Sequence, residues 1–470
     1  MSFFRQLEEH AQNVALVSEC GQTITYKELV SRADRVVSAV APRSLVFILA
    51  KNNIESLSAY VGVMRSGSVA FLLDEKIDKT LLENLYFRFR PQYIYGPTES
   101  VAVLMPAEEV EVSEGYALMR NVGAVDYVLD DRLALLLTTS GSTGSPKLVR
   151  QSYENINANA VAIADYLGIG SDERVITTMP MYYTYGLSII HTHLLMGATI
   201  VLNEATLMEK TFWERLKAEK VTSLNGVPYV YEMLKKLRFE KQELPELKYM
   251  TQAGGRLSPE LTKYFVELCS ERGMKFYTMY GQSEATARMS FVPWNEANSK
   301  IGSIGRPIPG GEFWLEDADG RAVTETETVG ELVYRGPNVT MGYAGCYEDL
   351  AKGDENEGVL HTGDLAQRDE DDFYYVVGRK KRFLKLYGSR VNLDEVEELL
   401  GQQGWDCICA GEDDFLRIYT TKEQDKEAIS TYVAQTMKIH RQGFSCSIID
   451  MVPRNNAGKI LYAELEKRCG

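Results

Sequence analysis

Short, almost purely apolar runs recur along the chain, and they limit the fold more than any other feature of the sequence. "SLVFILA" (44–50) and "LALLL" (133–137) are too short to span a bilayer, and their apolar residues do not alternate with polar ones. Such runs are typical of strands that are buried on both faces of a parallel sheet. Helical segments lie between them, for example over 54–65. We therefore expect an α/β fold of layered sheets and helices.

The pattern changes after about residue 301. Up to 375 the chain shows short strand-like runs such as "GELVYRG" and "FYYVVGR", separated by Gly, Pro and Asp turns. This stretch predicts a β-rich subdomain. We place a domain boundary at the basic stretch 380–382. The expected organisation is a large domain over 1–380, made of layered α/β subdomains and the β-rich part, and a small α+β domain over 381–470.

Charge and cysteine usage exclude several classes of protein. The formal net charge of −15 disfavours binding to nucleic acid or to an anionic membrane, because both need a basic surface. The seven cysteines are scattered without a C-x-x-C pair, so neither a zinc site nor a disulfide framework is indicated. Cys407 and Cys409 share one face of a probable strand. Because the N-terminus has charges where a signal peptide needs an apolar core, we expect a cytoplasmic protein.

One loop is unusual in its composition. "TTSGSTGSPK" (138–147) follows an apolar run and combines hydroxyls, two glycines and one lysine. Glycine lets the backbone approach a ligand, and exposed N–H groups with hydroxyls suit phosphate oxygens. The spacing differs from that of a Walker A loop, because Lys147 follows a proline and precedes a leucine. The sequence therefore predicts a phosphate-binding loop of another type.

Five further loops at predicted strand ends have the same character. They are "QAGGRLSPE" (252–260), "MYGQSEAT" (279–286), "HTGDLA" (361–366), "YYVVGRKKR" (374–382) and "PRNNAGKI" (453–460). Each is weak alone, since glycine turns and single charged residues are common on surfaces. Together and in this order, over nearly the whole chain, they resemble the adenylate-forming superfamily. That superfamily contains acyl- and aryl-CoA synthetases, the adenylation domains of nonribosomal peptide synthetases and firefly luciferase.

The resemblance implies a two-step ligase. A carboxylate attacks the α-phosphate of ATP and displaces pyrophosphate, and a thiol then attacks the acyl adenylate. Because an anion meets an anion in the first step, catalysis is mostly charge neutralisation and positioning. The implied cofactors are ATP and Mg²⁺. The implied partners are a small carboxylic acid and either CoA or the phosphopantetheine of a carrier protein.

The resemblance also assigns a catalytic set and a nucleotide site. Lys459 would reach the carboxylate and the α-phosphate, and Lys147 would hold the departing phosphates. Glu284 would hold Mg²⁺, with Thr143 as a second metal candidate. The other implied ATP contacts are Thr139, Ser140, Gly141, Ser142 and Gly144 on the phosphates; Gly254, Gly255, Arg256 and Tyr280 around the adenine; Asp364 and Arg379 at the ribose; and Gly281, Gln282, Ser283 and Tyr375 elsewhere in the nucleotide site.

In the superfamily the small domain is mobile, and the same movement is implied here. It would swing about a hinge at Lys381 so that a thiol can reach the adenylate. Lys385 and Gly388, in the hairpin that follows, would line the thiol tunnel. The short tail offers no evident basic cluster for the 3′-phosphate of CoA, so a carrier protein is as plausible an acceptor as CoA.

An acyl pocket is implied at the predicted helix after "PMYYTYGLS" (180–188). Its residues would be Tyr183, Thr184, Tyr185, Ser188, Asn225 and Gly226. Amino-acid-activating relatives commonly carry an aspartate where this chain has Thr184, and a buried ammonium without a carboxylate partner is costly. We therefore expect an acid with an uncharged chain, aryl or short and functionalised, rather than an α-amino acid.

Three alternatives remain open. The first is a stand-alone enzyme that loads an amino acid onto a carrier protein, which Thr184 disfavours. The second is a kinase-like phosphotransferase, which should carry a lysine-serine/threonine P-loop. The third is a catalytically inactive nucleotide-binding interaction protein, which would be expected to have lost Lys459, Glu284 or Asp364, and the sequence retains all three.

Overall fold

The computed structural model describes residues 2–101, 107–138, 147–380, 382–386, 389–412, 415–436, 440–454 and 460–467. It divides into two compact units. The first runs to Glu312 and takes in Arg335–Leu360, and the second contains Phe313–Tyr334 and the chain from His361 onwards. The predicted boundary at 380–382 lies within the second unit. That a domain boundary and a hinge lie there stays a prediction.

The first unit contains two mixed sheets. The one that we call the N-terminal sheet has the strand order β20 (Tyr343–Ala344), β9 (Leu148–Ser152), β8 (Leu133–Thr138), β4 (Val69–Asp74), β3 (Leu45–Ala50), β5 (Tyr93–Pro97), β7 (Tyr116–Asn121) and β6 (Ala107–Ser113). Strands β8, β4, β3 and β5 run parallel, and every residue of β3 is buried. This confirms the α/β fold predicted from the short apolar runs.

The second sheet, which we call the central sheet, lies in the same unit. Its order is β16 (Arg306–Pro307), β15 (Ser290–Phe291), β14 (Lys275–Tyr280), β13 (Tyr249–Gln252), β12 (Ser223–Gly226), β10 (Arg174–Ile176), β11 (Thr199–Val201), β1 (Val14–Val17) and β2 (Thr23–Thr25). Strands β12, β13 and β14 are parallel neighbours. The loops that follow their carboxyl ends therefore meet at one edge of the sheet, where ligands of open α/β sheets usually bind.

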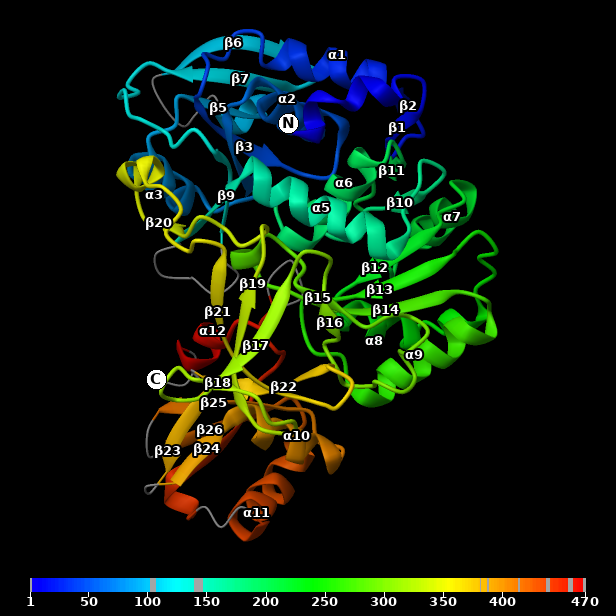
Figure 1. The fold of residues 1–470 in the computed structure, drawn as a ribbon, viewed down its shortest axis with the longest axis vertical. Helices are drawn as coiled ribbons and strands as arrows, with labels where there is room; N and C mark the ends of the chain where they lie inside the picture. The colour runs from blue at the N-terminus through cyan, green and yellow to red at the C-terminus, as the bar shows by residue number, and fades with distance from the viewer. Residues whose placement is uncertain are drawn as a thin grey trace. The chain divides into compact units, whose positions relative to one another are not determined.

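Helices connect these strands. They are α1 (Tyr26–Val36), α2 (Ile54–Ser66), α3 (Lys79–Phe89), α4 (Thr98–Val101), α5 (Tyr153–Leu167), α6 (Thr184–Leu195), α7 (Lys210–Ala218), α8 (Pro228–Lys236) and α9 (Pro259–Glu271). Figure 1 shows α8 and α9 beside the strands β12 to β14. The Ser258 side chain accepts from the Leu261 amide and caps α9. Within the described residues, no helix is both long and apolar enough to cross a membrane.

The second unit is built of smaller sheets. Its five-stranded sheet has the order β18 (Ala322–Val323), β17 (Glu312–Glu316), β19 (Gly330–Arg335), β21 (Val359–Arg368) and β22 (Tyr374–Arg379), and it is the predicted β-rich part. The hairpin β23 (Phe383–Leu386) and β24 (Ser389–Asn392) leads to α10 (Leu393–Gln402), followed by β25 (Cys407–Glu412), β26 (Phe415–Thr420), α11 (Lys426–Thr436), β27 (Phe444–Ile448) and α12 (Tyr462–Lys467). Cys407 and Cys409 belong to β25 and are buried in one hydrophobic core, so they share one face of the strand as predicted.

Arg150 of β9 fastens a distant segment to the N-terminal sheet. Its side chain is fully buried. The guanidinium donates to the main-chain carbonyls of Met341, Tyr343, Lys352 and Gly353 and to the carboxylate of Glu355. A buried guanidinium is tolerated when its donors are satisfied in this way. The arginine thereby holds 341–355 next to β9, where β20 completes the sheet.

We predict that Arg150→Met lowers the free energy of unfolding by about 3–5 kcal/mol, because it leaves buried carbonyls and Glu355 without their partner. Urea denaturation measures the loss. Arg132→Met is the control, since Arg132 pairs with Asp130 at a side-chain exposure of 54% and should contribute less than about 1 kcal/mol. Equal, small losses in both variants would contradict the anchoring role of Arg150.

Candidate active site

Lys147 and Glu284 lie far apart in the sequence, but both lie next to the side chain of Tyr343. The Tyr343 hydroxyl donates to Glu284 Oε1 at 2.8 Å. Lys147 Nζ lies 5.9 Å from the centroid of the Tyr343 ring. Because Tyr343 stands opposite Val149 in the β20–β9 pair, strand pairing holds it beside Lys147. Burial and the Glu284 carboxylate raise the pKa of Tyr343, so its hydroxyl stays protonated and remains a donor.

The main chain of Glu284 is fixed by the same returning segment. Its carbonyl oxygen accepts from the amide of Thr340 at 3.0 Å and from the Thr340 hydroxyl at 2.9 Å. Glu284 lies in the short 3-10 helix η4 (Ser283–Ala285). The Oγ atom of Ser283 is 2.8 Å from Oγ1 of Thr184, the first residue of α6. The predicted metal ligand and the predicted acyl pocket therefore adjoin.

The predicted adenine slot also adjoins the acyl pocket, at Gly254. Gly254 follows β13 and has φ +81°, a left-handed value that favours glycine. A β-carbon at this position would lie 2.8 Å from the Tyr183 hydroxyl oxygen and 3.1 Å from Val227. Burial raises the pKa of Tyr183 to about 12, so this hydroxyl is neutral. Gly255 and Arg256 follow, and the Arg256 side chain is exposed.

The predicted nucleotide contacts over 280–282 lie at the end of β14. Tyr280 is half-buried, and the Gln282 side chain donates to its hydroxyl at 3.2 Å. A β-carbon on Gly281 would lie 1.8 Å from a main-chain carbonyl oxygen, so this glycine permits a close backbone approach. At Gly226 a β-carbon would lie 2.6 Å from the side chain of Val230, so this glycine makes room for a side chain of α8. For both glycines, the structure supplies a packing reason.

The remaining residues of the predicted acyl pocket form a buried polar network. The Tyr185 hydroxyl donates to the Thr251 carbonyl at 3.0 Å, and Thr251 Oγ1 donates to Asn225 Oδ1 at 2.5 Å. Ser188 lies one helical turn after the start of α6, and its Oγ accepts from Arg288 Nη1 at 2.7 Å. All of these residues are buried in the first unit. The structure thus brings together the pocket residues predicted from the sequence.

The predicted ribose ligands lie together in the second unit. Asp364 and Arg379 face each other across the β21–β22 pair, and Arg379 Nε donates to Asp364 Oδ1 at 3.0 Å. Asp364 is only 2% exposed, whereas the Arg379 side chain is largely exposed. Tyr375 shares the strand of Arg379, but its hydroxyl donates to Asp369 at 3.2 Å. Asp364 and Arg379 form a pair that could accept and orient two hydroxyl groups.

Arg382 ties the predicted hinge region to the end of the chain. Its guanidinium forms ion pairs with Asp394 at 2.7 Å and Glu397 at 2.6 Å, both in α10. It also donates to the Tyr462 hydroxyl at 2.6 Å and lies over the Tyr462 ring. Tyr462 begins α12. The residue that follows the predicted hinge position is thus connected to the segment just after the predicted catalytic lysine.

Several predicted site residues lie outside the described part of the chain. They are Thr139, Ser140, Gly141, Ser142, Thr143, Gly144, Lys381, Gly388 and Lys459, and Lys385 is known here only by its place in β23. The described residues on either side of 139–146 and of 455–459 form β-type pairs. Thr138 stands opposite Leu148, and Arg454 bridges to Ile460. The predicted roles of these residues stay predictions.

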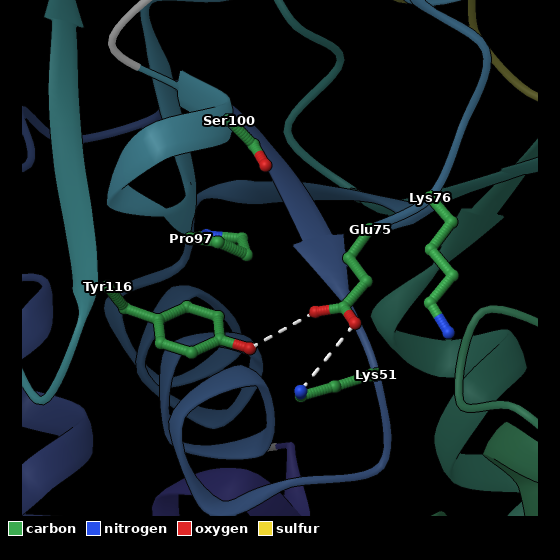
Figure 2. Close-up of a pocket in the computed structure, with 6 residues that line it drawn as sticks. All are labelled: Lys51, Glu75, Lys76, Pro97, Ser100 and Tyr116. Carbon is green, nitrogen blue, oxygen red and sulfur yellow. Dashed lines mark hydrogen bonds and ion pairs between the residues drawn. The ribbon is translucent and has the colours of Figure 1, made fainter.

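A pocket of about 360 Å³ opens at the carboxyl ends of β3 and β4. Lys51, Glu75, Lys76, Pro97, Ser100 and Tyr116 line it (Figure 2). Glu75 lies between Lys51 Nζ, at 3.6 Å, and the Tyr116 hydroxyl, at 3.3 Å. The residues predicted from the sequence are not among those that line it. Because Glu75 already pairs with Lys51, this pocket gives little evidence for a ligand.

Sequence reasoning missed two residues of the first unit. Tyr343 lies in "MGYAG" (341–345), where two glycines flank an aromatic residue, but nothing in the local pattern indicates that it pairs with β9. Arg288 lies in "EATARMSFV" (284–292), where a single cation stands in a run of small and apolar residues. That isolated charge was the available signal, since an arginine is rarely buried unless it has a partner.

A comparison with protein families decides the class of the protein. The model of the family described as AMP-binding enzyme matches residues 3–344. The chain belongs to this family. The resemblance derived from the ordered loops is thereby confirmed, and so is the predicted class of adenylate-forming ligase.

This AMP-binding enzyme has curated relatives along its whole length. It is 27% identical to the 2-succinylbenzoate–CoA ligase of Bacillus subtilis (strain 168). The alignment, 484 residues long, covers 97% of this chain and 95% of that one. It is 26% identical to the 2-succinylbenzoate–CoA ligase of Bacillus mycoides (strain KBAB4), over 90% of this chain and 88% of the relative.

Solved structures share the fold. The O-succinylbenzoate coenzyme A synthetase of Bacillus subtilis in complex with AMP aligns with a TM-score of 0.77 at 24% identity, over 99% of this chain and 98% of that one. ATP-bound MatB from Rhodopseudomonas palustris aligns with a TM-score of 0.78 at 20% identity, and the alignment covers 100% of this chain and 99% of that one. The predicted fold class is thus confirmed.

We predict that Gly254→Ala weakens AMP binding about tenfold or more, because the new methyl group meets the Tyr183 hydroxyl in a strained backbone position. Calorimetric titration with AMP measures the effect. Gly21→Ala is a matched control, since Gly21 has φ +82° and nothing within 4 Å of its added β-carbon. If both variants bound AMP like the wild type, Gly254 would not belong to the nucleotide site.

Proposed function

We propose that this AMP-binding enzyme activates a small carboxylic acid with ATP, releases pyrophosphate and then transfers the acyl group to the thiol of CoA. The observation that carries the proposal is the contact of Lys147 and Glu284 with one tyrosine, Tyr343. A lysine and a carboxylate brought together in this way suit the phosphates of ATP and their magnesium ion. The relatives, which are named as CoA ligases, give further support.

The chain's residues would supply charge and position in the first step. Lys147 would neutralise the departing β- and γ-phosphates, and Lys459 would stabilise the transition state at the α-phosphate. Asp364 would accept the ribose hydroxyls, held in place by Arg379. Gly254 would lie against the adenine, next to Tyr183.

Glu284 fits the needs of Mg²⁺. Mg²⁺ usually binds one or two carboxylates together with substrate phosphates and water, and it does not need a protein cage. The bound ion would neutralise phosphate charge. Glu284 would orient it, and Tyr343 would fix the carboxylate.

The substrate we propose is an aryl or short functionalised acid without an α-ammonium group. Thr184 bonds with Ser283 and brings no charge, so an ammonium would lack a carboxylate partner there. The relatives named as 2-succinylbenzoate–CoA ligases act, by their titles, on an aryl acid. CoA is preferred over a carrier protein as the acceptor because these titles name it. The cytoplasmic location stays a prediction.

Exchange of labelled pyrophosphate into ATP, dependent on added carboxylate, tests the proposal. Aryl, short-chain, long-chain and α-amino acids form the panel, and CoA and a phosphopantetheinylated carrier protein are then offered as acceptors. We expect exchange with aryl or short acids and thioester formation with CoA. Exchange with α-amino acids alone would favour the loading enzyme, and ADP as the product would favour a phosphotransferase. Nucleotide binding without exchange for any acid would indicate an inactive interaction protein.

We predict that Lys459→Ala reduces pyrophosphate exchange about 10²- to 10³-fold, because one charge contact on the transition state is lost. Thioester formation from preformed acyl adenylate should be largely retained. Lys422→Ala, a change of an exposed lysine in the same unit, is the control. Near-normal exchange by the Lys459 variant would remove this lysine from the catalytic set.

A second prediction concerns the proposed hinge. Lys381→Pro restricts φ at this position, so it should slow thioester formation while leaving pyrophosphate exchange in place. Lys381→Ala controls for loss of the side chain. Equal losses of both half-reactions in the proline variant would mean that the residue serves the structure alone.

A further inference from the structure

Arg288 places a full positive charge beside the predicted acyl pocket. It lies between η4 and β15 and is only 2% exposed. Its Nη1 donates to Ser188 Oγ at 2.7 Å, and its guanidinium carbon lies 3.9 Å from the centroid of the Tyr185 ring. Both contacts are with residues already assigned to the pocket. The cation is therefore positioned by the pocket walls themselves.

This charge has no ionic partner among the described residues. Its Nε atom is buried and makes no hydrogen bond. Arg150, the other buried arginine among the described residues, is paired with Glu355. The partly buried Arg382 is paired with Asp394 and Glu397. A buried guanidinium without a counter-ion is strongly unfavourable, so its retention calls for a compensating anion.

A second unsatisfied donor is the side chain of Asn225, which bonds to Thr251 as Tyr185 does. The Nδ2 atom of Asn225 is buried without a hydrogen-bond partner, and its Oδ1 accepts from Thr251. The Tyr185 ring carries Arg288 on its face, and its hydroxyl donates to Thr251. Both unpartnered groups are donors. A ligand that satisfies them must present acceptors, and an ionised carboxylate presents only acceptors.

We propose that Arg288 binds a second carboxylate of the acid substrate, separate from the carboxylate that is activated. This rests on the proposed function and specifies its substrate class. Thr184, at the start of α6, bonds to Ser283. Ser188 lies one turn further along the same face of α6 and bonds to Arg288, which comes from the segment between η4 and β15. The two carboxylates would therefore be separated by on the order of one helical turn, about 5 Å. A short or aryl dicarboxylate fits this spacing.

The proposal revises the expectation from the sequence that the acid has an uncharged chain. That expectation rested on Thr184, which still disfavours an α-ammonium. Arg288 adds repulsion against any cationic group in the pocket. It also explains why the pocket is polar although it lies in the core, since a site with buried donors rejects ligands that leave them unpaired.

Matched pairs of acids test the proposal on the wild-type protein. In pyrophosphate exchange, 2-succinylbenzoate is compared with 3-benzoylpropionate, and adipate with hexanoate, because each pair differs by one carboxylate. We expect kcat/KM at least 10²-fold higher for the dicarboxylate of one pair. Exchange that favours the monocarboxylate in both pairs overturns the proposal and leaves the proposed function intact. Absence of exchange for all acids overturns the proposed function instead.

Variants then assign the preference to Arg288. Arg288→Met should reduce the ratio of dicarboxylate to monocarboxylate activity about 10²-fold, and Arg288→Lys should restore part of it, because it keeps the charge. Equal losses for both acids in Arg288→Met would mean that the arginine is structural. If that variant does not fold, thermal shifts of the wild type decide: a larger shift with the dicarboxylate supports the proposal, and equal shifts overturn it.

Discussion

The fully buried guanidinium of Arg150 is the interaction on which the first unit depends. One side chain on β9 satisfies carbonyl groups of a segment that lies about two hundred residues further along the chain. That segment carries Tyr343, and Tyr343 is the residue that Lys147 and Glu284 share. Arg150 therefore fixes the position of Tyr343 in the candidate site, although it contacts neither the proposed nucleotide nor the proposed acid.

Buried arginines recur in this fold with different partners. Arg150 is satisfied by carbonyls and Glu355, and Arg382 is satisfied by two carboxylates and a tyrosine. Both contribute to the structure when the protein is empty. Arg288 lacks such a partner among the described residues, and its contacts are a hydroxyl and an aromatic face. Arg150 and Arg382 therefore stabilise the fold, whereas Arg288 is available to bind a ligand.

The sequence predicted the helices and strands better than the long-range contacts between them. A strand such as Leu45–Ala50 depends on a continuous apolar run, so the local pattern reveals it. The ordered loops gave the family because glycine and charge spacing reflect the phosphate chemistry. Tyr343 and Arg288 escaped prediction because their roles arise from contacts with β9 and α6, which no local spacing encodes. Thr184 brings no charge to the predicted pocket, and the nearby charge of Arg288 comes from another loop, where it contacts Ser188 and Tyr185.

The two-residue strand β20 has a consequence for any attempt to divide the protein. It pairs with β9 through Tyr343 and Ala344, so the N-terminal sheet is completed by residues that follow the Phe313–Tyr334 excursion into the second unit. A fragment that ended near Glu312 would leave the outer side of β9 as an open edge. Unpaired main-chain groups at such an edge pair readily with other chains, so this fragment would be prone to aggregate. A soluble piece should extend beyond Leu360 or carry a replacement for the missing strand.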